Sequence, residues 1–397
     1  MARPRANARD RRLGGKRLPE FEMRQTDTRS LMNEHQRRPV VASSDDALGT
    51  CVDLPRRRMN TMLLMAALSL PRAALGEQAP EASPYRVIDF DWTDPARSRA
   101  VPARLYWPAV AATTPVPLVV FSHGIGGSRN GYSYLGKNWS AHGVASLHVQ
   151  HVGSDAALWR GNPFGVVDRL QTAARESEAL ARVADVSFAL DRLLSREFSD
   201  FGMVVNRRRI VAAGHSYGAN TSLLAIGAEV IRDGQALHCL DPRFSAAVVI
   251  SAPPFYGEQN LAAILAKISV PTIHVTSTHD VIRIPGYYSG LEDRLAVFDA
   301  IAAPRKLLAV FEGGSHSMFT DRRNTGGPTT NARVKAATAD LTLAFFDWIF
   351  ESDGTALARW QDRWRFLLAR APSFKSPSLP HFGVADQETG TSRQRWR

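Results

Sequence analysis

The fold of this chain is decided by the stretch Val211-Ala-Ala-Gly-His-Ser-Tyr-Gly-Ala219. Its apolar start predicts a buried strand, and the small residues at its end predict the beginning of a helix. In such a tight strand-to-helix turn only very small side chains fit two positions before and after the serine, where Gly214 and Gly218 stand. The turn forces the serine into a strained backbone conformation with its hydroxyl clear of the sheet. The pattern therefore predicts that Ser216 is a nucleophile; the alternative is a serine in an ordinary turn.

Composition and charge exclude one class of partner. The chain has 397 residues, 44% of them hydrophobic and 22% charged, which is enough for a large core, and its formal charge is +11. Residues 1–58 hold 14 basic and 8 acidic side chains, and residues 359–397 hold 8 and 3, so the intervening chain carries no net charge. A domain without net charge has no long-range attraction for polyanions. We therefore expect no nucleic-acid partner.

The N-terminal 83 residues predict three segments outside the folded domain. Residues 1–58 have no sustained apolar period and are interpreted as disordered or as an over-extended start of translation. Residues 59–76 follow three arginines with an apolar run and then small residues, the order of a secretory signal peptide; a short buried helix is the alternative. Residues 77–83 are interpreted as a linker. We expect export to the periplasm or medium, or a cytoplasmic protein if residues 59–76 are not a signal peptide.

Two further features bear on the cellular setting. The apolar run within residues 59–76 is far shorter than the roughly 20 residues that cross a bilayer, so we expect no permanent membrane span. Residues 371–397 are rich in Pro, Ser and Arg and are interpreted as a disordered basic tail. With Cys51 outside the predicted domain, Cys239 is expected to be unpaired, and two cysteines do not decide the redox compartment.

Residues 84–370 predict one α/β domain. Partial alternation in Tyr85–Trp92 and Ala100–Trp107 predicts an antiparallel edge hairpin with one face in water. Short apolar runs predict buried strands at Val116–Phe121, Gly143–Gln150, Arg209–Ala213, Ala246–Ile250, Val270–Thr276 and Lys306–Phe311. Helices are predicted at Tyr132–His142, Val166–Ser195, Leu261–Ile268, Thr329–Phe350 and Leu357–Ala369. Strands that alternate with helices favour a mostly parallel sheet with helices on both faces.

The G-x-S-x-G turn between an apolar strand and a helix resembles the nucleophile elbow of α/β-hydrolases. A serine hydroxyl is a poor nucleophile at neutral pH, so it needs a base, and the base needs an orienting carboxylate. The resemblance implies that these groups follow the serine in the order acid, then histidine, at the carboxyl ends of later strands.

Two residues fit that order. Of the eleven histidines, only His316 and His381 lie well downstream of an acid that itself follows Ser216. His316 stands in a glycine-containing loop just after a predicted strand, whereas His381 lies in the predicted tail, so we favour His316 as the base. Asp280 closely follows the strand predicted at residues 270–276 and is the predicted acid. The alternatives, in a segment where a solvated helical face explains them, are Glu292, Asp293 and Asp299.

The developing oxyanion needs two backbone N–H donors. One is predicted to come from Tyr217, the residue after the nucleophile. The other is predicted to come from Ile125, in the glycine-rich loop His123–Gly127 that follows an earlier strand. His123 itself is interpreted as a structural hydrogen-bonding residue rather than a base.

Other motifs are weak. His274 and His279 stand five residues apart without further ligands, which does not predict a zinc site. Gly124–Ser128 has the spacing neither of a phosphate loop nor of a dinucleotide fingerprint. We therefore expect no metal and no cofactor. His279 is interpreted as a loop histidine next to the predicted acid.

Several stretches together resemble one bacterial group. They are Phe121-Ser-His-Gly-Ile-Gly-Gly-Ser-Arg129, Val149-Gln-His-Val-Gly-Ser-Asp155, Asp185-Val-Ser-Phe-Ala-Leu-Asp191 and Ala213-Gly-His-Ser-Tyr-Gly-Ala-Asn220. The group is the bacterial predicted dienelactone hydrolases, which are similar to platelet-activating-factor acetylhydrolases. The resemblance covers about residues 84–350 and implies a serine esterase, often exported, with Ser216, Asp280 and His316 as its triad. True dienelactone hydrolases have a cysteine at the position of Ser216, so dienelactone is not the expected substrate.

The function expected from the sequence is cofactor-independent hydrolysis of small carboxylic esters. An amidase or peptidase using the same triad is one alternative, and a non-catalytic binding protein on a hydrolase scaffold is the other. Trp159, Tyr287 and Tyr288 are predicted to supply aromatic walls of the substrate pocket, with plain loop packing as the alternative.

Overall fold

The structure, a computed structural model, describes residues 83–109, 114–195, 202–232, 234–322, 325 and 328–373. The predicted segments 1–58 and 59–76, the linker up to residue 82 and the tail from residue 374 lie outside these ranges, so their interpretations stay predictions. Cys51 also lies outside them, and Cys239, which is described, is a free thiol.

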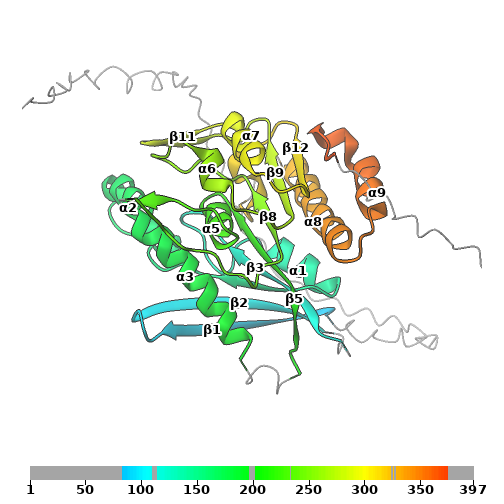
Figure 1. Cartoon of the computed structure of the whole chain (residues 1–397), viewed down its shortest axis with the longest axis horizontal. Coiled ribbons are helices and arrows are strands. Elements are labelled where there is room, and N and C mark those ends of the chain that lie inside the picture. Colours follow the sequence, from blue (N-terminus) through cyan, green and yellow to red (C-terminus); the bar gives the residue numbers. More distant parts are fainter. Residues whose placement is uncertain are drawn as a thin grey trace, which may run out of the picture. The chain divides into compact units, whose positions relative to one another are not determined.

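Nine strands of the described residues form one sheet (Figure 1). Their order across the sheet is β1 (Tyr85–Asp94), β2 (Arg99–Pro108), β4 (Ala145–Val149), β3 (Val116–Ser122), β5 (Val205–His215), β8 (Ala246–Ile250), β9 (Thr272–Ser277), β12 (Lys306–Phe311) and β13 (Leu368–Arg370). From β4 to β12 neighbouring strands are parallel. The β1–β2 hairpin at one edge and β13 at the other are antiparallel. The predicted edge hairpin and mostly parallel sheet are thus confirmed.

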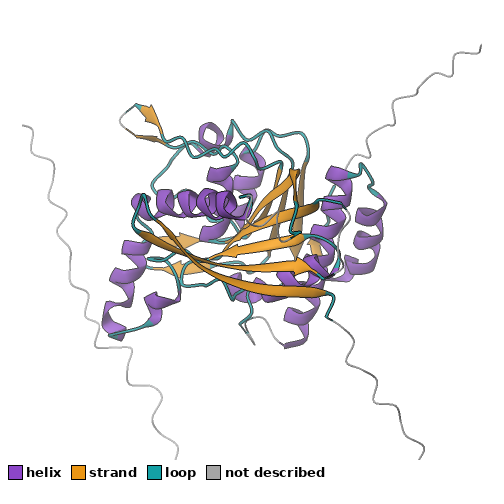
Figure 2. Cartoon of the chain, turned by 90° about the horizontal axis from the view of Figure 1, so that it is seen from below, coloured by secondary structure: helices purple, strands orange, loops and turns teal. Residues whose placement is uncertain are grey.

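Eight α-helices of the described residues cover the sheet. They are α1 (Ser133–Ala141), α2 (Val166–Ala173), α3 (Glu176–Leu193), α5 (Tyr217–Ala225), α6 (Leu261–Leu265), α7 (Leu291–Ala300), α8 (Pro328–Phe350) and α9 (Thr355–Trp364). Figure 2 shows helices on both sides of the strands. The chain also forms the 3₁₀ turns η1 (Ala156–Trp159), η2 (Pro163–Gly165), η3 (His316–Phe319) and η4 (Arg365–Leu367). Two small hairpins pair β6 (Ile231–Arg232) with β7 (Gln235–Ala236), and β10 (Ile282–Ile284) with β11 (Tyr287–Ser289).

The two faces of the sheet have separate cores, because side chains alternate along each strand. On β5, Ile210 and Ala212 join the cluster that contains residues of α3, α5, α6 and α7. Val211 and Ala213 join the cluster that contains residues of α1, α8 and α9. The central strand β8 is buried at every position. Because a strand buried on both faces has no polar side, its sequence is a continuous apolar run.

Three predicted elements differ from the structure. The helix predicted at Val166–Ser195 is broken after α2, because Arg175 adopts an extended conformation and α3 starts a new direction. Residues 281–291, for which the sequence predicts neither a strand nor a helix, contain the β10–β11 hairpin. The helix predicted at Leu357–Ala369 ends at Trp364, and Leu368–Arg370 instead pairs with β12. This pairing satisfies backbone groups of β12 that a helix would leave exposed at the sheet edge.

None of the helices in the described ranges has both the length and the apolar composition that a membrane span needs.

Buried histidines make the stability of the fold depend on pH. Burial lowers the pKa of His148 to about 4, and burial together with the charge of Lys306 lowers the pKa of His274 to about 3. In the unfolded chain both side chains bind a proton near pH 6.5. Between about pH 4 and 6.5 the unfolded state therefore binds protons that the folded state does not, so the free energy of unfolding falls as the pH falls.

We expect His274→Leu to flatten this pH dependence. The loss of one differential proton reduces the slope of unfolding free energy by at most about 1.4 kcal/mol per pH unit in the window from about pH 4 to 6. Urea titrations at half-unit pH steps measure the slope. His279→Leu is the control, because it removes an exposed histidine in place of a buried one. Equal slopes in wild type and His274→Leu contradict the expectation.

Candidate active site

The strand-to-helix turn around Ser216 has the strain that its sequence predicts. Ser216 lies between β5 and α5 with φ 56° and ψ −124°, a region that residues other than glycine rarely adopt. A Cβ atom at Gly214 would overlap the carbonyl group of Gly218, and a Cβ at Gly218 would overlap the carbonyl of Ser122 on β3. Both positions therefore exclude any side chain, which holds the nucleophile helix against the neighbouring strand.

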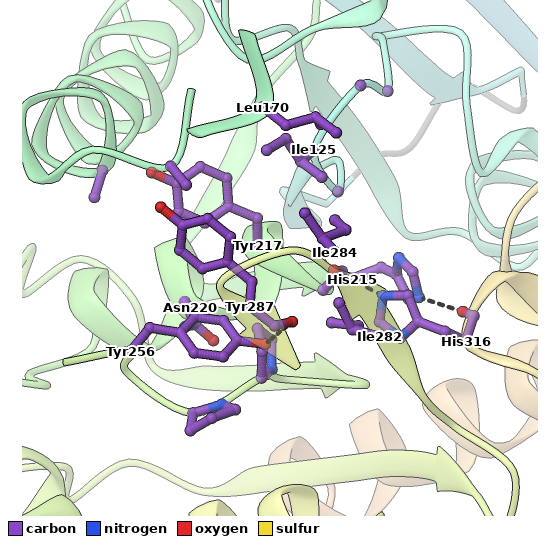
Figure 3. A pocket seen from close by; sticks show the side chains of 18 of the residues that line it. Ile125, Leu170, His215, Tyr217, Asn220, Tyr256, Ile282, Ile284, Tyr287 and His316 are labelled. Carbon is purple, nitrogen blue, oxygen red and sulfur yellow. Dashed lines mark hydrogen bonds between the residues drawn. The ribbon is translucent and has the colours of Figure 1, made fainter. Parts of the chain in front are cut away.

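The three predicted triad residues lie in hydrogen-bond contact. His316 Nε2 lies 2.8 Å from Ser216 Oγ, and His316 Nδ1 lies 2.7 Å from Asp280 Oδ1 (Figure 3 shows His316 beside His215). Asp280 follows β9, and His316 begins η3 after β12. Because β5, β9 and β12 are parallel, their carboxyl ends meet at one edge of the sheet, which brings together residues 100 positions apart.

Asp280 is held as a buried carboxylate. Burial alone would raise its pKa, but the charges of His316 and Arg294 and the hydrogen bond from His316 outweigh burial and hold the pKa below its ordinary value. Thr276 Oγ1 donates to Asp280 Oδ2 at 2.7 Å, and Arg294 Nη2 lies 3.4 Å from Oδ1. An ionised Asp280 accepts the Nδ1–H of His316, so Nε2 is left with a lone pair for the Ser216 hydroxyl proton.

His215, which sequence reasoning passed over, connects the loop of His316 to Tyr132 and the glycine-rich loop. Its Nε2–H donates to the carbonyl of His316 at 2.9 Å, so its Nδ1 accepts from the Tyr132 hydroxyl at 2.8 Å. Tyr132 Oη in turn accepts the N–H of Gly124 at 3.3 Å. Burial, and next the charge of His316, lowers the pKa of His215 to about 3, which keeps the ring neutral and this arrangement intact.

The two N–H groups predicted to bind the oxyanion are not bonded to another acceptor among the described residues. Among the described residues, no hydrogen bond uses the N–H of Ile125 or of Tyr217. The Gly124 carbonyl accepts from His123 Nδ1 at 2.7 Å and from the N–H of Gly127 at 3.0 Å. Because the Gly124–Ile125 peptide is trans, this carbonyl and the Ile125 N–H point in opposite directions. His123 is thus a structural hydrogen-bonding residue, as its sequence context predicts, and burial lowers its pKa well below the ordinary value.

A cavity of about 760 Å³ opens over the triad, and its walls are mostly apolar (Figure 3). Trp159 lines it and donates its Nε1–H to the carbonyl of Gly126 at 2.8 Å. Tyr287 also lines it. Tyr288 does not: successive side chains of β11 point to opposite sides, and Tyr288 is 70% exposed to solvent. Tyr256, which sequence reasoning missed, lines the cavity next to Tyr287.

The remaining candidates do not join the site. Glu292 and Asp299 are exposed on α7, and Asp293 Oδ2 accepts the N–H of Gly290 at the start of that helix. His381 lies outside the described residues. Within the part of the chain that the structure describes, no three His, Cys, Asp or Glu side chains are grouped as metal ligands.

Parts of this chain are similar to known proteins. Residues 98–160 match the family described as platelet-activating factor acetylhydrolase, isoform II. The chain is 25% identical over 235 residues to a platelet-activating factor acetylhydrolase of Cavia porcellus; the match covers 52% of this chain and 48% of that protein. The chain therefore spans about half the length of the curated relative that it matches. The strand order of the sheet and the strained serine turn decide the fold.

The chain has the α/β-hydrolase fold. The resemblance and the fold class predicted from its sequence are confirmed. Two solved structures are also similar to this chain. A ferulic acid esterase from Streptomyces cinnamoneus has a TM-score of 0.49 at 20% identity, covering 70% of this chain and 94% of that one. A protein from Klebsiella pneumoniae, provisionally named dienelactone hydrolase, has a TM-score of 0.46 at 16% identity, covering 66% and 98%.

We expect Gly218→Ala to abolish the reactivity of Ser216 toward a fluorophosphonate and to destabilise the protein. The new methyl group must displace the backbone of β3 or of α5, because the atom it meets is the Ser122 carbonyl oxygen and not a movable side chain. Thermal unfolding and covalent labelling of Ser216 by a fluorophosphonate measure both effects. The matched control is Gly290→Ala, where nothing lies within 4 Å of the added Cβ. Wild-type labelling in Gly218→Ala would refute the steric account.

Proposed function

We propose that this α/β-hydrolase cleaves carboxylic esters through an acyl-enzyme formed on Ser216. The observation that carries the proposal is the continuous hydrogen-bonded chain from Ser216 Oγ through His316 to Asp280, at 2.8 and 2.7 Å. It supplies a nucleophile, a base and an orienting carboxylate in one line. The family match to acetylhydrolases supports the same class of reaction.

Acylation begins when the Ser216 hydroxyl attacks the ester carbonyl and passes its proton to His316 Nε2. Negative charge then develops on the carbonyl oxygen. The N–H groups of Ile125 and Tyr217 stabilise this oxyanion, since neither is engaged elsewhere among the described residues. Asp280 stabilises the imidazolium that forms and keeps its Nδ1 protonated. As the tetrahedral intermediate collapses, His316 gives its proton to the leaving alkoxide, and the alcohol departs.

Deacylation repeats these steps with water as the nucleophile. His316 Nε2 removes a proton from the water molecule, the hydroxide adds to the acyl carbonyl, and the same two N–H groups hold the second oxyanion. Collapse breaks the bond to Ser216 Oγ, and His316 returns the proton to it. Deacylation yields a carboxylic acid and regenerates the serine. The reaction consumes only the ester and water, so the proposed steps need no cofactor.

The cavity above the triad supports a small-molecule substrate. Its volume of about 760 Å³ lies within the range of small-molecule binding sites, and its mostly apolar walls suit an acyl chain or an aromatic group. Trp159, Tyr256 and Tyr287 form aromatic walls of this cavity.

We expect p-nitrophenyl esters from acetyl to octanoyl to be hydrolysed with a burst of p-nitrophenol, since acylation of Ser216 releases the first product. Ser216→Ala lowers kcat by at least about 10³-fold. Ser187→Ala is the matched control, because Ser187 Oγ donates to Asp241 away from the cavity. Equal rates in wild type and Ser216→Ala rule out the proposed nucleophile, and faster cleavage of matched p-nitroanilides assigns the protein to the amidases instead.

We expect Asp280→Asn to lower kcat by at least about 10²-fold, because an amide can donate to Nδ1 of His316 and so favour the wrong tautomer. Steady-state kinetics with the best ester of the series measure the loss. Asp299→Asn, which changes an exposed carboxylate of α7, is the control and keeps the wild-type rate. An unchanged kcat in Asp280→Asn moves the acid role to another carboxylate.

A further inference from the structure

The face of α3 toward the active site carries charged side chains in the interior of the protein. Glu178, Arg182 and Asp185 stand four and three residues apart, which places them on one side of a helix. Arg182 and Asp185 are 0% exposed. A fully buried arginine is rare, because its charge must be compensated by hydrogen bonds or counter-ions.

The guanidinium of Arg182 donates hydrogen bonds to three groups around the predicted oxyanion hole. Its Nε donates to Thr221 Oγ1 at 3.0 Å, its Nη1 donates to Ser154 Oγ at 2.8 Å, and its Nη2 donates to the carbonyl of His123. The guanidinium also lies over the ring of Tyr217, 4.5 Å from the ring centroid. No carboxylate of the described residues forms an ion pair with Arg182.

On one side these contacts fix the loop that presents Ile125. The His123–Gly124 peptide is bound at both ends, since its carbonyl accepts from Arg182 and its N–H donates to Tyr132. Ser154, the second partner of Arg182, accepts the N–H of Gly126 on its carbonyl at 2.8 Å. Arg182 therefore restrains the loop both before and after Ile125.

On the other side the same guanidinium restrains the nucleophile helix. Thr221 Oγ1, which accepts from Arg182 Nε, donates to the Tyr217 carbonyl at 3.1 Å. The ring of Tyr217 packs under the guanidinium. Arg182 is thus in contact with both segments that carry the N–H groups of the oxyanion hole.

The charge of Arg182 is compensated indirectly, because the Ser154 hydroxyl connects it to the carboxylate of Glu178. The hydroxyl of Ser154 accepts from Arg182 and donates to Glu178 Oε1 at 2.8 Å, and Glu178 pairs with Arg99 at 3.1 Å. Asp185, on the same helix face, pairs with Arg99 at 2.9 Å. Burial lowers the pKa of Arg182 to about 10, which leaves it protonated at neutral pH.

We propose that Arg182 is the positioning residue that sets the separation between the Ile125 and Tyr217 N–H groups, and with it the stabilisation of the oxyanion. The proposal rests on the ester hydrolase function proposed above. A planar fork with several donors binds the loop carbonyl, Ser154 and Thr221 at once, which a lysine ammonium on a flexible stem does not reproduce. Arg182 does not touch the substrate; it acts through the two backbone donors.

The first test separates transition-state stabilisation from binding. Arg182→Met is expected to lower kcat by about 10²-fold, the size of losing one oxyanion donor, with KM changed less than about threefold. Affinity for an aryl trifluoromethyl ketone, which forms an oxyanion adduct on serine, falls by the same factor as kcat. Arg182→Lys restores the charge but not the fork and recovers only part of the loss. Full recovery by lysine, or an unchanged kcat in folded Arg182→Met, overturns the proposal.

The matched control is Arg243→Met. Arg243 also uses its guanidinium for hydrogen bonds, to Asp241, Asp191 and the carbonyl of Ser187, but lies outside the cavity. It is expected to lower thermal stability while kcat and ketone affinity keep their wild-type values. If Arg182→Met shows that same pattern, Arg182 is only structural and the proposal is wrong.

A second variant covers the case in which Arg182→Met does not fold, and a second measurement covers the case in which the wild type is inactive on esters. If Arg182→Met does not fold, Thr221→Val removes one partner of the guanidinium without a change of shape, and a parallel fall of kcat and ketone affinity of about threefold or more is expected; wild-type values for both overturn the proposal. If wild type hydrolyses no ester, the proposed function fails, and the rate of fluorophosphonate labelling at Ser216 then tests Arg182 alone. Slower labelling in the Arg182 variants supports the positioning role, and equal labelling overturns it.

Discussion

The contact on which the rest of this structure depends is the approach of the nucleophile helix to the neighbouring strand, with Gly218 against the Ser122 carbonyl. The approach leaves no volume for a side chain at residues 214 and 218. It also holds Ser216 at a positive φ. The strain is sustained because β5 is paired on both sides, with β3 and with β8, and its residues near the turn are buried. A strained serine at the end of an edge strand would relax; here the sheet resists the movement.

The buried polar side chains behind Ser216 are held by hydrogen bonds and not by apolar packing. His123, His151, Arg182 and Asp185 are all buried, and each forms a hydrogen bond with another of the four. Such a network costs desolvation, and hydrophobic residues of equal volume often stabilise a fold as well or better. Its benefit lies in direction: hydrogen bonds fix the orientation of peptide groups, which apolar packing leaves free. The oxyanion loop is therefore oriented by polar contacts, while the sheet and helices are held by apolar ones.

Much of this fold follows from local patterns in the sequence. The apolar strands, the strained turn and the order of Ser216, Asp280 and His316 are each visible in a few residues, and the parallel sheet then brings the strand ends together. Other features depend on contacts between distant segments. The break at Arg175 has no glycine or proline to mark it. The face that a hairpin residue presents depends on register, so Tyr288 was placed wrongly in the pocket.

The buried polar residues show the same limit. Charges on a helix predict a solvated face or a buried paired face equally well, and only the packing of α3 against the oxyanion loop distinguishes them. His215 lies inside the motif itself, yet its two partners, the His316 carbonyl and the Tyr132 hydroxyl, stand 101 and 83 residues away.

Tyr217 has a consequence for how such a site diversifies. Its backbone N–H belongs to the chemistry proposed for the ester carbonyl, while its ring lines the substrate cavity (Figure 3). Every amino acid except proline carries the same N–H, whereas the side chain is variable. A substitution at residue 217 therefore changes the cavity wall and the contact with Arg182 but keeps the backbone N–H, whereas residues 214 and 218 admit no side chain at all.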